Sequence, residues 1–317
     1  MKILITGASG FIGFHLSKYL LKNKKNTIIG IDNLNSYFFK KIKKKRLNIL
    51  KSKKNFIFYR INLANEKKLN GIFNENKPVI IFHIAGQPGV IYSFKNPKIY
   101  EINNILVTQI LSRVAKKYKV KKFIFASSSS VYGDQKKFPI KETFKLKPKN
   151  PYAITKVKSE KTIKNYFLNT KIDFIIFRFF TVYGPLGRHD MFIHKFLNAL
   201  KKNKKIKLHN NGMNFRDFTY VDDVIKILNK SINYKVKNSI INICRSKPIL
   251  TTKLVELILK FYKKNNIKII KTKSIKGEML KTHGCNKKLI KHFGNIKFTD
   301  IAKGLRETIR QYKLIGF

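Results

Sequence analysis

The sequence of 317 residues is poor in acidic residues and in cysteine. It has 16 Asp and Glu against 69 Lys and Arg, and its formal net charge is +53. The two cysteines, Cys244 and Cys285, lack the spacing of a metal site and are too few for a disulfide framework, which favours a reducing compartment. No apolar run is long enough to span a membrane, and Met1 leads directly into the apolar stretch 2–6, without room for a signal peptide. We therefore expect a cytoplasmic protein without a membrane segment or a metal site.

The positive charge is spread along the whole chain. Lysines occur in every loop and on most polar helix faces, from Lys22 to Lys313. A field concentrated on one face would attract nucleic acid. Because Lys, Asn, Ile and Phe share A/T-rich codons, we interpret the charge mainly as a composition bias of the source genome. A nucleic-acid partner is therefore not expected.

Short β-branched and aromatic runs alternate with helical patterns in the first 180 residues. The runs lie at 2–6, 27–32, 55–61, 78–85, 121–128 and 172–180. Strands that are apolar on both faces and separated by helices indicate a parallel sheet covered on both sides. We predict a doubly wound α/β domain over residues 1–180 and a smaller α/β substrate-binding lobe over 181–317, with segments near 215–245 returning to the first domain.

A glycine pattern lies between the first strand and the first helix. Gly7 suits the tight turn, Gly10 lets the backbone approach a pyrophosphate, and Gly13 lets the helix pack on the strand. The free N–H groups of the helix N-terminus would face the phosphates. Asp32 ends the second strand, where its carboxylate can accept hydrogen bonds from a ribose 2′-hydroxyl and would repel a 2′-phosphate. The pattern predicts a Rossmann-like site for NAD rather than NADP.

A Tyr-x-x-x-Lys pair, Tyr152 and Lys156, follows Asn150 and Pro151. Three other pairs with this spacing occur, but here Asn150 suits a helix cap and Pro151 the first turn, which places both side chains on one helical face. For Tyr152 to act as a base, its pKa must fall from near 10 to about 7, which corresponds to roughly 4 kcal/mol. One ammonium about 4 Å away at an effective dielectric constant near 20 supplies about that much.

These features together resemble the extended short-chain dehydrogenase/reductase superfamily, and within it the NAD-dependent epimerase/dehydratase family. The resemblance covers Met1 to about Asn242. The segments most similar to UDP-glucuronate 4-epimerases are GIDNLN from Gly30, SSSSVYG from Ser127, RFFTVYGP from Arg178, GRHDM from Gly187 and RDFTYVDD from Arg216.

The resemblance implies a catalytic set of Ser128, Tyr152 and Lys156. Ser128 would hydrogen-bond the sugar 4-oxygen, and Tyr152 would remove its proton while C4 is oxidised by NAD. The 4-keto sugar would then rotate and be reduced on its other face. Further cofactor contacts implied by the resemblance, beyond the glycines and Asp32, come from Phe11, Ile12, Asn33, Asn62, Leu63, Ala85, Gln87, Asn104, Tyr152 and Lys156.

The serine run separates the reaction classes of this family. Related 4,6-dehydratases place an Asp-Glu pair directly after the catalytic hydroxyl, where this chain has Ser129 and Ser130. The missing acids argue against elimination of water. The family's carboxylate-binding positions are matched by Ser129, Ser130, Thr181 and Arg188, and its diphosphate-binding position by Arg216. We expect structural roles for Arg178 and for His83.

Two alternatives remain open. The sugar could be UDP-glucose or its N-acetyl form, for which Arg188 would not be needed. A protein of a different class would be a non-catalytic Rossmann protein that binds nucleic acid through its basic surface. The resemblance also implies a homodimer, formed by the helix after 78–85 and the helix that carries Tyr152.

Overall fold

The computed structural model describes all residues except 36, 38–39, 235–236, 265–266, 275–276 and 316–317. The chain divides into two compact units. Unit 1 comprises 1–133, 145–179 and 225–241, and unit 2 comprises 134–144, 180–224 and 242–317. A late segment of the chain therefore belongs to unit 1, and the short segment 134–144 belongs to unit 2.

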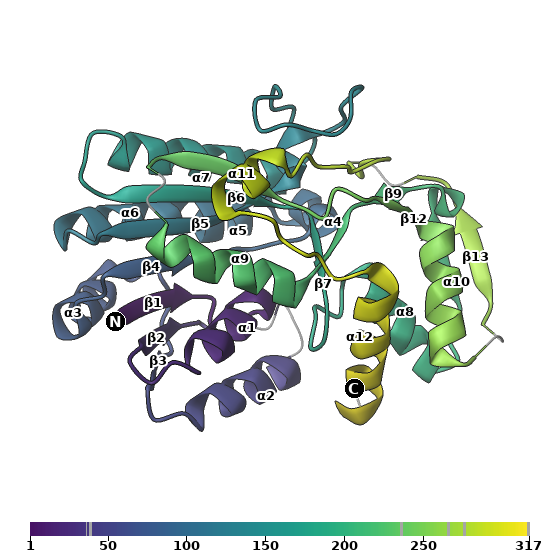
Figure 1. Cartoon of the computed structure of the whole chain (residues 1–317), viewed down its shortest axis with the longest axis horizontal. Helices are drawn as coiled ribbons and strands as arrows, with labels where there is room; N and C mark the ends of the chain where they lie inside the picture. Colours follow the sequence, from purple (N-terminus) through teal and green to yellow (C-terminus); the bar gives the residue numbers. More distant parts are fainter. Residues whose placement is uncertain (36, 38–39, 235–236, 265–266, 275–276, 316–317) are drawn as a thin grey trace. The chain divides into compact units, whose positions relative to one another are not determined.

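Unit 1 is built on a seven-stranded sheet of order β11-β6-β5-β4-β1-β2-β3 (Figure 1). The strands from β1 to β6 pair in parallel. Their bounds are Lys2–Thr6 for β1, Thr27–Ile31 for β2, Phe56–Tyr59 for β3, Ile80–His83 for β4, Lys122–Ser128 for β5, Asp173–Phe179 for β6 and Ser239–Ile243 for β11. The order changes direction between β1 and β4, which is the position where such sheets bind ligands at the carboxyl ends of their strands. The predicted doubly wound fold is confirmed.

Helices cover the sheet on both faces, as the continuous apolar strands predicted. On one face, apolar side chains of α3, α6 and α7 share a core with strand residues such as Leu4 and Phe123. The elements of this unit are α1 Phe11–Leu20, α2 Lys40–Lys51, α3 Glu66–Asn76, α4 Val90–Lys95, α5 Pro97–Tyr100, a π-helix Glu101–Leu106, α6 Val107–Lys117, a 3-10 turn Ser129–Tyr132, α7 Pro151–Phe167 and most of α9 Val221–Asn233. The apolar residues of 100–118 recur every three to four positions, as in one regular helix, whereas the structure has a π-helical segment inside this stretch.

Unit 2 contains three two-stranded sheets and its own apolar core. The strand pairs are β7 Thr181–Tyr183 with β10 Phe218–Tyr220, β9 Phe215–Arg216 with β12 Ile249–Leu250, and β8 Ile206–His209 with β13 Ile269–Thr272. The helices are α8 Phe192–Lys201, α10 Thr251–Tyr262, α11 Lys287–Phe293 and α12 Ile301–Ile315, with a 3-10 turn at Asn210–Gly212. Its core includes Phe196, Leu254 and Leu305. Within the described parts of both units, no helix has the length and apolarity needed to cross a membrane.

His83, at the end of β4, is a core residue, as expected. Its Nδ1 lies 2.8 Å from Thr6 Oγ1 and its Nε2 lies 3.1 Å from Thr108 Oγ1. Complete burial, together with the positive charge of Lys156, lowers the pKa of His83 to about 3. The imidazole is therefore neutral at physiological pH, and its two ring nitrogens connect β4 to Thr6 of β1 and to Thr108 of α6.

A buried ion pair connects β6 to α7. Arg178 donates from Nε to Glu160 Oε1 at 3.0 Å and from Nη2 to Glu160 Oε2 at 2.7 Å, and its Nη1 donates to the Tyr132 hydroxyl at 2.9 Å. Both charged side chains are less than 5% exposed, with values of 3% and 4%. Arg178 thus has the structural role that we expected, because it pairs with a carboxylate on the helix that carries Tyr152 and Lys156.

Glu160→Gln should destabilise the fold strongly, because it leaves the Arg178 charge buried without its counter-ion. We expect a loss of about 3 to 5 kcal/mol in the free energy of unfolding, measured by urea titration. Glu66→Gln is the matched control, since it breaks the exposed Arg113–Glu66 pair, whose side chains are 51% and 36% exposed and should contribute little. Equal losses in the two variants would contradict the role of the buried pair.

Candidate active site

The loop between β1 and α1 has the geometry of a dinucleotide-binding turn. Gly7 has a φ of +70°, and a Cβ there would lie 2.9 Å from the main-chain N and Cα of Ala85. A Cβ on Gly13 would lie 2.1 Å from the carbonyl oxygen of Gly7. Helix α1 starts after Gly10 with no side-chain cap and no acidic residue in its first turn. Its amino end therefore suits an anion such as a pyrophosphate.

Asp32 lies just after β2 and is held by main-chain donors. Its two oxygens accept hydrogen bonds from Ser9 N at 3.1 Å and from Leu34 N at 2.8 Å. The sequence did not single out Lys43, whose Nζ lies 3.8 Å from Asp32 Oδ1 and donates to Asn35 Oδ1 at 2.8 Å. Burial lowers the pKa of Lys43, and the charge of Asp32 opposes this effect. The fixed carboxylate fits the predicted ribose contact.

Asn104, in the π-helical segment, holds the stretch that follows β4. Its Oδ1 accepts from Gln87 N at 2.7 Å, and its Nδ2 donates to Gln87 O at 3.1 Å and to Thr155 Oγ1 at 2.9 Å. The side-chain Nε2 of Gln87 is buried and has no hydrogen-bond partner within the described residues. Because buried donors are nearly always satisfied, this group fits a ligand contact. A Cβ on Gly86 would lie 3.0 Å from Asn104 Oδ1 and 3.3 Å from Lys156 Nζ, so this segment adjoins the predicted catalytic lysine.

The predicted catalytic residues lie at the end of β5 and in the first two turns of α7. Ser128 is the last residue of β5, and its Oγ accepts from Ser130 N at 3.2 Å. As predicted, α7 starts with Pro151, and Asn150 Oδ1 caps it by accepting from Ala153 N at 2.9 Å. Tyr152 packs edge-on against Tyr100, with 6.1 Å between ring centroids.

Lys156 is buried, and it joins α7 to β5. Its Nζ donates to the carbonyl oxygen of Ala126 at 2.8 Å and lies 4.7 Å from the centre of the Phe125 ring. Burial lowers the pKa of Lys156 to about 8, although the charge of Glu160 acts in the opposite direction. The ammonium form therefore predominates at neutral pH, with little margin.

The environment of the serine run is uncharged where a dehydratase would have acids. Ser129 is buried and Ser130 is half-buried, both in the 3-10 turn that follows Ser128. The carboxylate of Glu160 does reach the run, but it accepts from Ser127 Oγ and pairs with Arg178. A carboxylate committed in this way is not placed to act as an acid.

Three predicted substrate residues belong to unit 2. Thr181 is half-buried at the start of β7. Arg188 forms a two-bond ion pair with Asp190, with 3.0 Å from Nε to Oδ1 and 2.7 Å from Nη2 to Oδ2. Burial raises the pKa of Asp190, but the Arg188 charge outweighs this and keeps the pKa below its ordinary value. Arg188 is therefore oriented by a carboxylate of its own chain.

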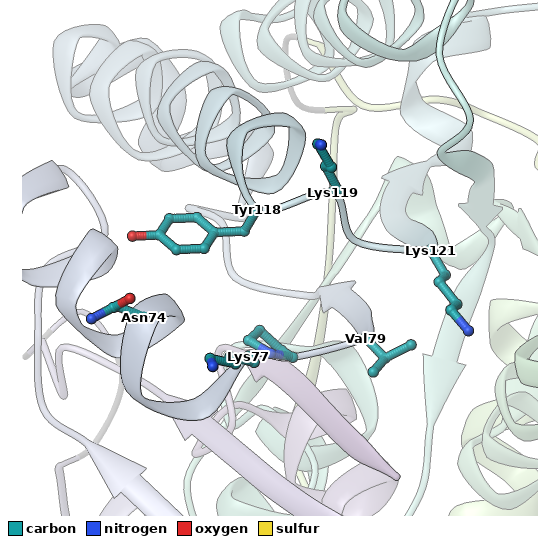
Figure 2. A pocket seen from close by; sticks show the side chains of 7 residues that line it. Asn74, Lys77, Val79, Tyr118, Lys119 and Lys121 are labelled. Atoms are coloured by element: carbon teal, nitrogen blue, oxygen red, sulfur yellow. The ribbon is translucent and has the colours of Figure 1, made fainter.

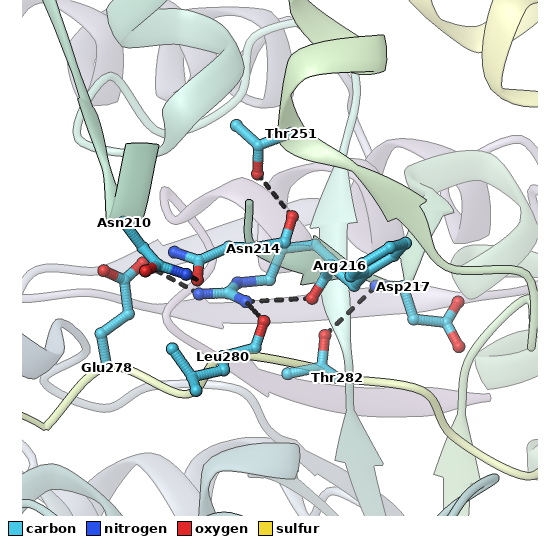
Figure 3. Close-up of polar contacts among 9 residues, drawn as sticks. Asn210, Asn214, Arg216, Asp217, Thr251, Glu278, Leu280 and Thr282 are labelled. Carbon is cyan, nitrogen blue, oxygen red and sulfur yellow. Dashed lines mark hydrogen bonds and ion pairs between the residues drawn. The ribbon is translucent and has the colours of Figure 1, made fainter. Parts of the chain in front are cut away.

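Arg216, in β9, also has an internal carboxylate partner (Figure 3). Its Nη2 donates to Glu278 Oε1 at 2.9 Å, and its Nη1 donates to the carbonyl oxygens of Phe215 at 2.9 Å and Leu280 at 3.1 Å. Burial lowers the pKa of Arg216, and Glu278 opposes this effect. Contacts within the chain therefore hold the guanidinium in place without a ligand.

Unit 1 brings the predicted cofactor and catalytic residues together at the carboxyl ends of β1, β2, β4 and β5. Asn62 is exposed and accepts from Ala64 N, and Leu63 is buried beside it. Sequence reasoning missed Glu160 and Asp190 as the partners of Arg178 and Arg188. In the sequence, only the scarcity of acidic residues could have drawn attention to these two carboxylates.

A cavity of about 290 Å³ opens at the opposite edge of the sheet, next to the amino ends of β4 and β5 (Figure 2). It is lined by Asn74, Lys77, Pro78, Val79, Tyr118, Lys119 and Lys121. The ammonium groups of its lysines point away from one another, so they do not converge on an anion. Among the residues that the structure describes, no three His, Cys, Asp or Glu side chains are grouped to hold a metal ion.

Known proteins resemble this chain in sequence and in fold. The profile of the NAD dependent epimerase/dehydratase family matches residues 3–244. A UDP-glucuronate 4-epimerase of Thermodesulfobacterium geofontis is 38% identical over 257 residues, which cover 80% of this chain and 79% of that protein. A crystal structure of UDP-glucuronic acid 4-epimerase from Bacillus cereus, in complex with UDP-glucuronic acid and NAD, matches with a TM-score of 0.94 at 31% identity, over 99% of this chain and 100% of that chain.

A related enzyme with a different sugar also matches. The UDP-glucose 4-epimerase of Thermotoga maritima, with UDP-glucose, has a TM-score of 0.90 at 27% identity, over 99% of both chains. The profile match covers well over half of the sequence, and its range includes the glycine turn, the serine run and the Tyr-x-x-x-Lys pair. The family resemblance inferred from the sequence is confirmed, and the chain belongs to the NAD dependent epimerase/dehydratase family.

Proposed function

We propose that this protein is an NAD-dependent 4-epimerase that interconverts UDP-glucuronate and UDP-galacturonate. The observation that carries the proposal is the uncharged serine run that follows Ser128 at the end of β5. Ser129 and Ser130 follow Ser128 where elimination of water would need an acid and a base, and Glu160 is held by Arg178. The two UDP-glucuronate 4-epimerases named above support the same reaction and the same sugar nucleotide, and the UDP-glucose 4-epimerase supports the reaction alone.

The chain's own groups perform the proton transfer. Ser128 would hydrogen-bond the sugar 4-oxygen, and the phenolate of Tyr152 would accept its proton. The ammonium of Lys156, which is buried, would stabilise that phenolate, because opposite charges attract strongly where water is excluded. Bound NAD supplies the oxidation at C4 and the later reduction of the 4-keto sugar. The glycine turn, Asp32 and Gln87 would hold this cofactor through the whole cycle.

The substrate carboxylate must stay in place during the oxidised stage, since a β-keto acid loses carbon dioxide readily. We assign this task to Ser129, Ser130, Thr181 and Arg188, which combine neutral donors with one guanidinium. Asp190 would orient Arg188 for the purpose. We assign the diphosphate to Arg216.

A second candidate keeps the reaction but changes the sugar to UDP-glucose or UDP-N-acetylglucosamine. The pairing of Arg188 with Asp190 favours it, because an internally neutralised guanidinium attracts a carboxylate less than an unpaired one. Incubation of the purified protein with the three UDP-sugars, without added NAD, separates the candidates by chromatography of the products. UDP-galacturonate formed at unchanged mass supports the proposal, whereas conversion of UDP-glucose alone supports the second candidate. Salt-sensitive RNA binding without any conversion would favour the nucleic-acid alternative.

We also propose a homodimer formed through α4, the π-helical segment, α6 and α7. Large apolar side chains are exposed on α4, the π-helical segment and α7, with Ile91 at 50%, Phe94 at 40%, Leu106 at 42% and Ile154 at 41%. Exposed apolar groups of this kind mark association surfaces. We further propose that the enzyme acts in the cytoplasm and supplies UDP-galacturonate for surface polysaccharide.

Tyr152→Phe should abolish epimerisation but leave NAD bound. The phenyl ring keeps the packing against Tyr100 and removes only the hydroxyl that takes the proton, so turnover should fall about 100-fold to 10,000-fold. The rate is measured with UDP-glucuronate, and the bound NAD by its absorbance after denaturation of the protein. Turnover like that of the wild type would remove Tyr152 from its proposed role.

Arg188→Ala should reduce kcat/KM for UDP-glucuronate more than for UDP-glucose. Loss of a charge-assisted hydrogen bond corresponds to about a 10-fold to 100-fold decrease. Arg310→Ala is the matched control, because Arg310 pairs with Glu307 on exposed parts of α12. Equal losses for the two sugars would contradict the assignment of the carboxylate to Arg188.

Lys156→Met should stabilise the cofactor-free protein in a pH-dependent way. The pKa of Lys156 is lowered to about 8 in the fold from 10.5, so burial of its charge costs most below pH 8 and nothing well above pH 10.5. The stability of the variant relative to wild type should therefore be roughly 2 to 3 kcal/mol greater at pH 6.5 than at pH 10. Urea titrations at both pH values measure this difference. If the stability difference between the variant and the wild type were the same at pH 6.5 and pH 10, the fold would not lower the pKa of Lys156, which would contradict the prediction.

A further inference from the structure

His194 closes the loop that carries Arg188. This histidine lies in the first turn of α8, and its ring Nε2 is 2.9 Å from the main-chain oxygen of Gly184, 10 residues earlier in the chain. Because a carbonyl oxygen only accepts hydrogen bonds, Nε2 carries the proton and donates. Arg188 and Asp190 both lie inside the loop 184–194 that this hydrogen bond closes.

The turn just before Arg188 is shaped around the imidazole. A Cβ on Gly187 would lie 2.3 Å from Nε2 of His194 and 2.6 Å from its Cδ2, so the main chain of the turn rests directly on the ring. Leu186 has a φ of +51°, a left-handed conformation that is unfavourable for a residue with a Cβ. Such a conformation persists only where its surroundings hold it. The imidazole supplies a hydrogen bond and a packing surface for this purpose.

The ring of His194 is itself anchored in the core of unit 2. The residue is 7% exposed, and its ring centroid lies 6.2 Å from that of Tyr312 in α12. Tyr312 belongs to the apolar core of the unit, together with Phe196 and Leu197 of α8. An apolar side chain at position 194 would fill the same space, but it would leave the Gly184 oxygen without this donor. The histidine therefore connects the core to the loop.

Arg188 needs such a connection because its ion-pair partner belongs to the same loop. The guanidinium contacts Asp190 at 3.0 Å and 2.7 Å, while the two side chains remain 22% and 27% exposed. This pair fixes the guanidinium relative to the loop, whereas the hydrogen bond from His194 fixes the start of the loop relative to α8. Recognition of a carboxylate by two parallel hydrogen bonds depends on the orientation of the guanidinium fork.

We propose that His194 is a positioning residue that sets the Arg188 loop for the carboxylate of a sugar nucleotide. The inference rests on the proposed function, because it takes Arg188 to be the group that contacts this carboxylate. His194 itself would not contact the ligand. By restricting the conformations of the loop 184–194, it would reduce the conformational entropy that is lost when the carboxylate binds. His194 would thus favour a uronate over a neutral sugar.

Calorimetric titrations of the full chain loaded with NAD test this proposal, with UDP-glucuronate, UDP-glucose and UDP as ligands. In His194→Phe, which keeps a ring but loses the donor, UDP-glucuronate should bind on the order of tenfold more weakly, since one charge-assisted contact is weakened. UDP-glucose and UDP should bind as they do to the wild type. His194→Gln, whose side-chain N–H can reach the Gly184 oxygen, should recover most of the affinity.

A double-mutant cycle with Arg188→Ala distinguishes positioning from general stability. If His194 acts through Arg188, adding His194→Phe to Arg188→Ala should cause no further loss of affinity for UDP-glucuronate. Gly187→Ala disturbs the same turn independently, because its Cβ would meet the imidazole, and it should also weaken the binding of UDP-glucuronate selectively. Thermal unfolding checks that each variant is folded, and Gly187→Ala decides the question if His194→Phe does not fold.

Several results would overturn the proposal. Equal losses for the three ligands in His194→Phe would indicate a purely structural role. Unchanged binding of UDP-glucuronate, or a further loss in the Arg188→Ala background, would also contradict it. If the wild type binds UDP-glucuronate but does not convert it, the proposed function fails, and the titrations still decide the role of His194: a selective loss that requires Arg188 supports it. Absence of UDP-glucuronate binding to the wild type would contradict both.

Discussion

A buried ammonium group, that of Lys156, joins the helix that carries Tyr152 to the strand that ends at Ser128. Its hydrogen bond to the Ala126 carbonyl fixes α7 against β5, and Glu160, one turn further along α7, fixes the same helix to β6 through Arg178. The negative charge of Glu160 partly offsets the cost of burying the Lys156 ammonium. The catalytic geometry that we propose for unit 1 depends on these two anchors. Burial also leaves Lys156 with a pKa of about 8, which keeps it charged at neutral pH without a large reserve.

Carboxylates have an unusual importance in a chain with so few of them. Glu160 stabilises the fold, Asp190 orients Arg188, and Glu278 contacts Arg216. Elsewhere the positive charges repel one another and attract any anion nearby. The uncharged serines after Ser128 are informative for a different reason, since they would leave the reacting sugar without an acid for elimination.

Much of unit 1 could be predicted because its signals are local. The glycine turn, the apolar strands, and Asn150 with Pro151 each specify a backbone conformation within a few residues. Lys43 could not be found in this way, because it lies in a run of lysines and is distinguished only by the fold that brings it to Asp32. The π-helical segment around Asn104 was also missed, since its apolar spacing resembles that of a regular helix. The acidic partners Glu160 and Asp190 became visible only when tertiary contacts showed which cations they meet.

The central claim is that oxidation and reduction at C4 take place within one cycle on the same bound cofactor. UDP-glucuronate carrying deuterium at C4 tests it most directly, with purified protein and no added NAD. The account predicts UDP-galacturonate that retains the deuterium at C4, because the hydrogen removed from one face is returned to the other. Replacement of the label by solvent hydrogen, or a product that has lost water or carbon dioxide, would contradict it.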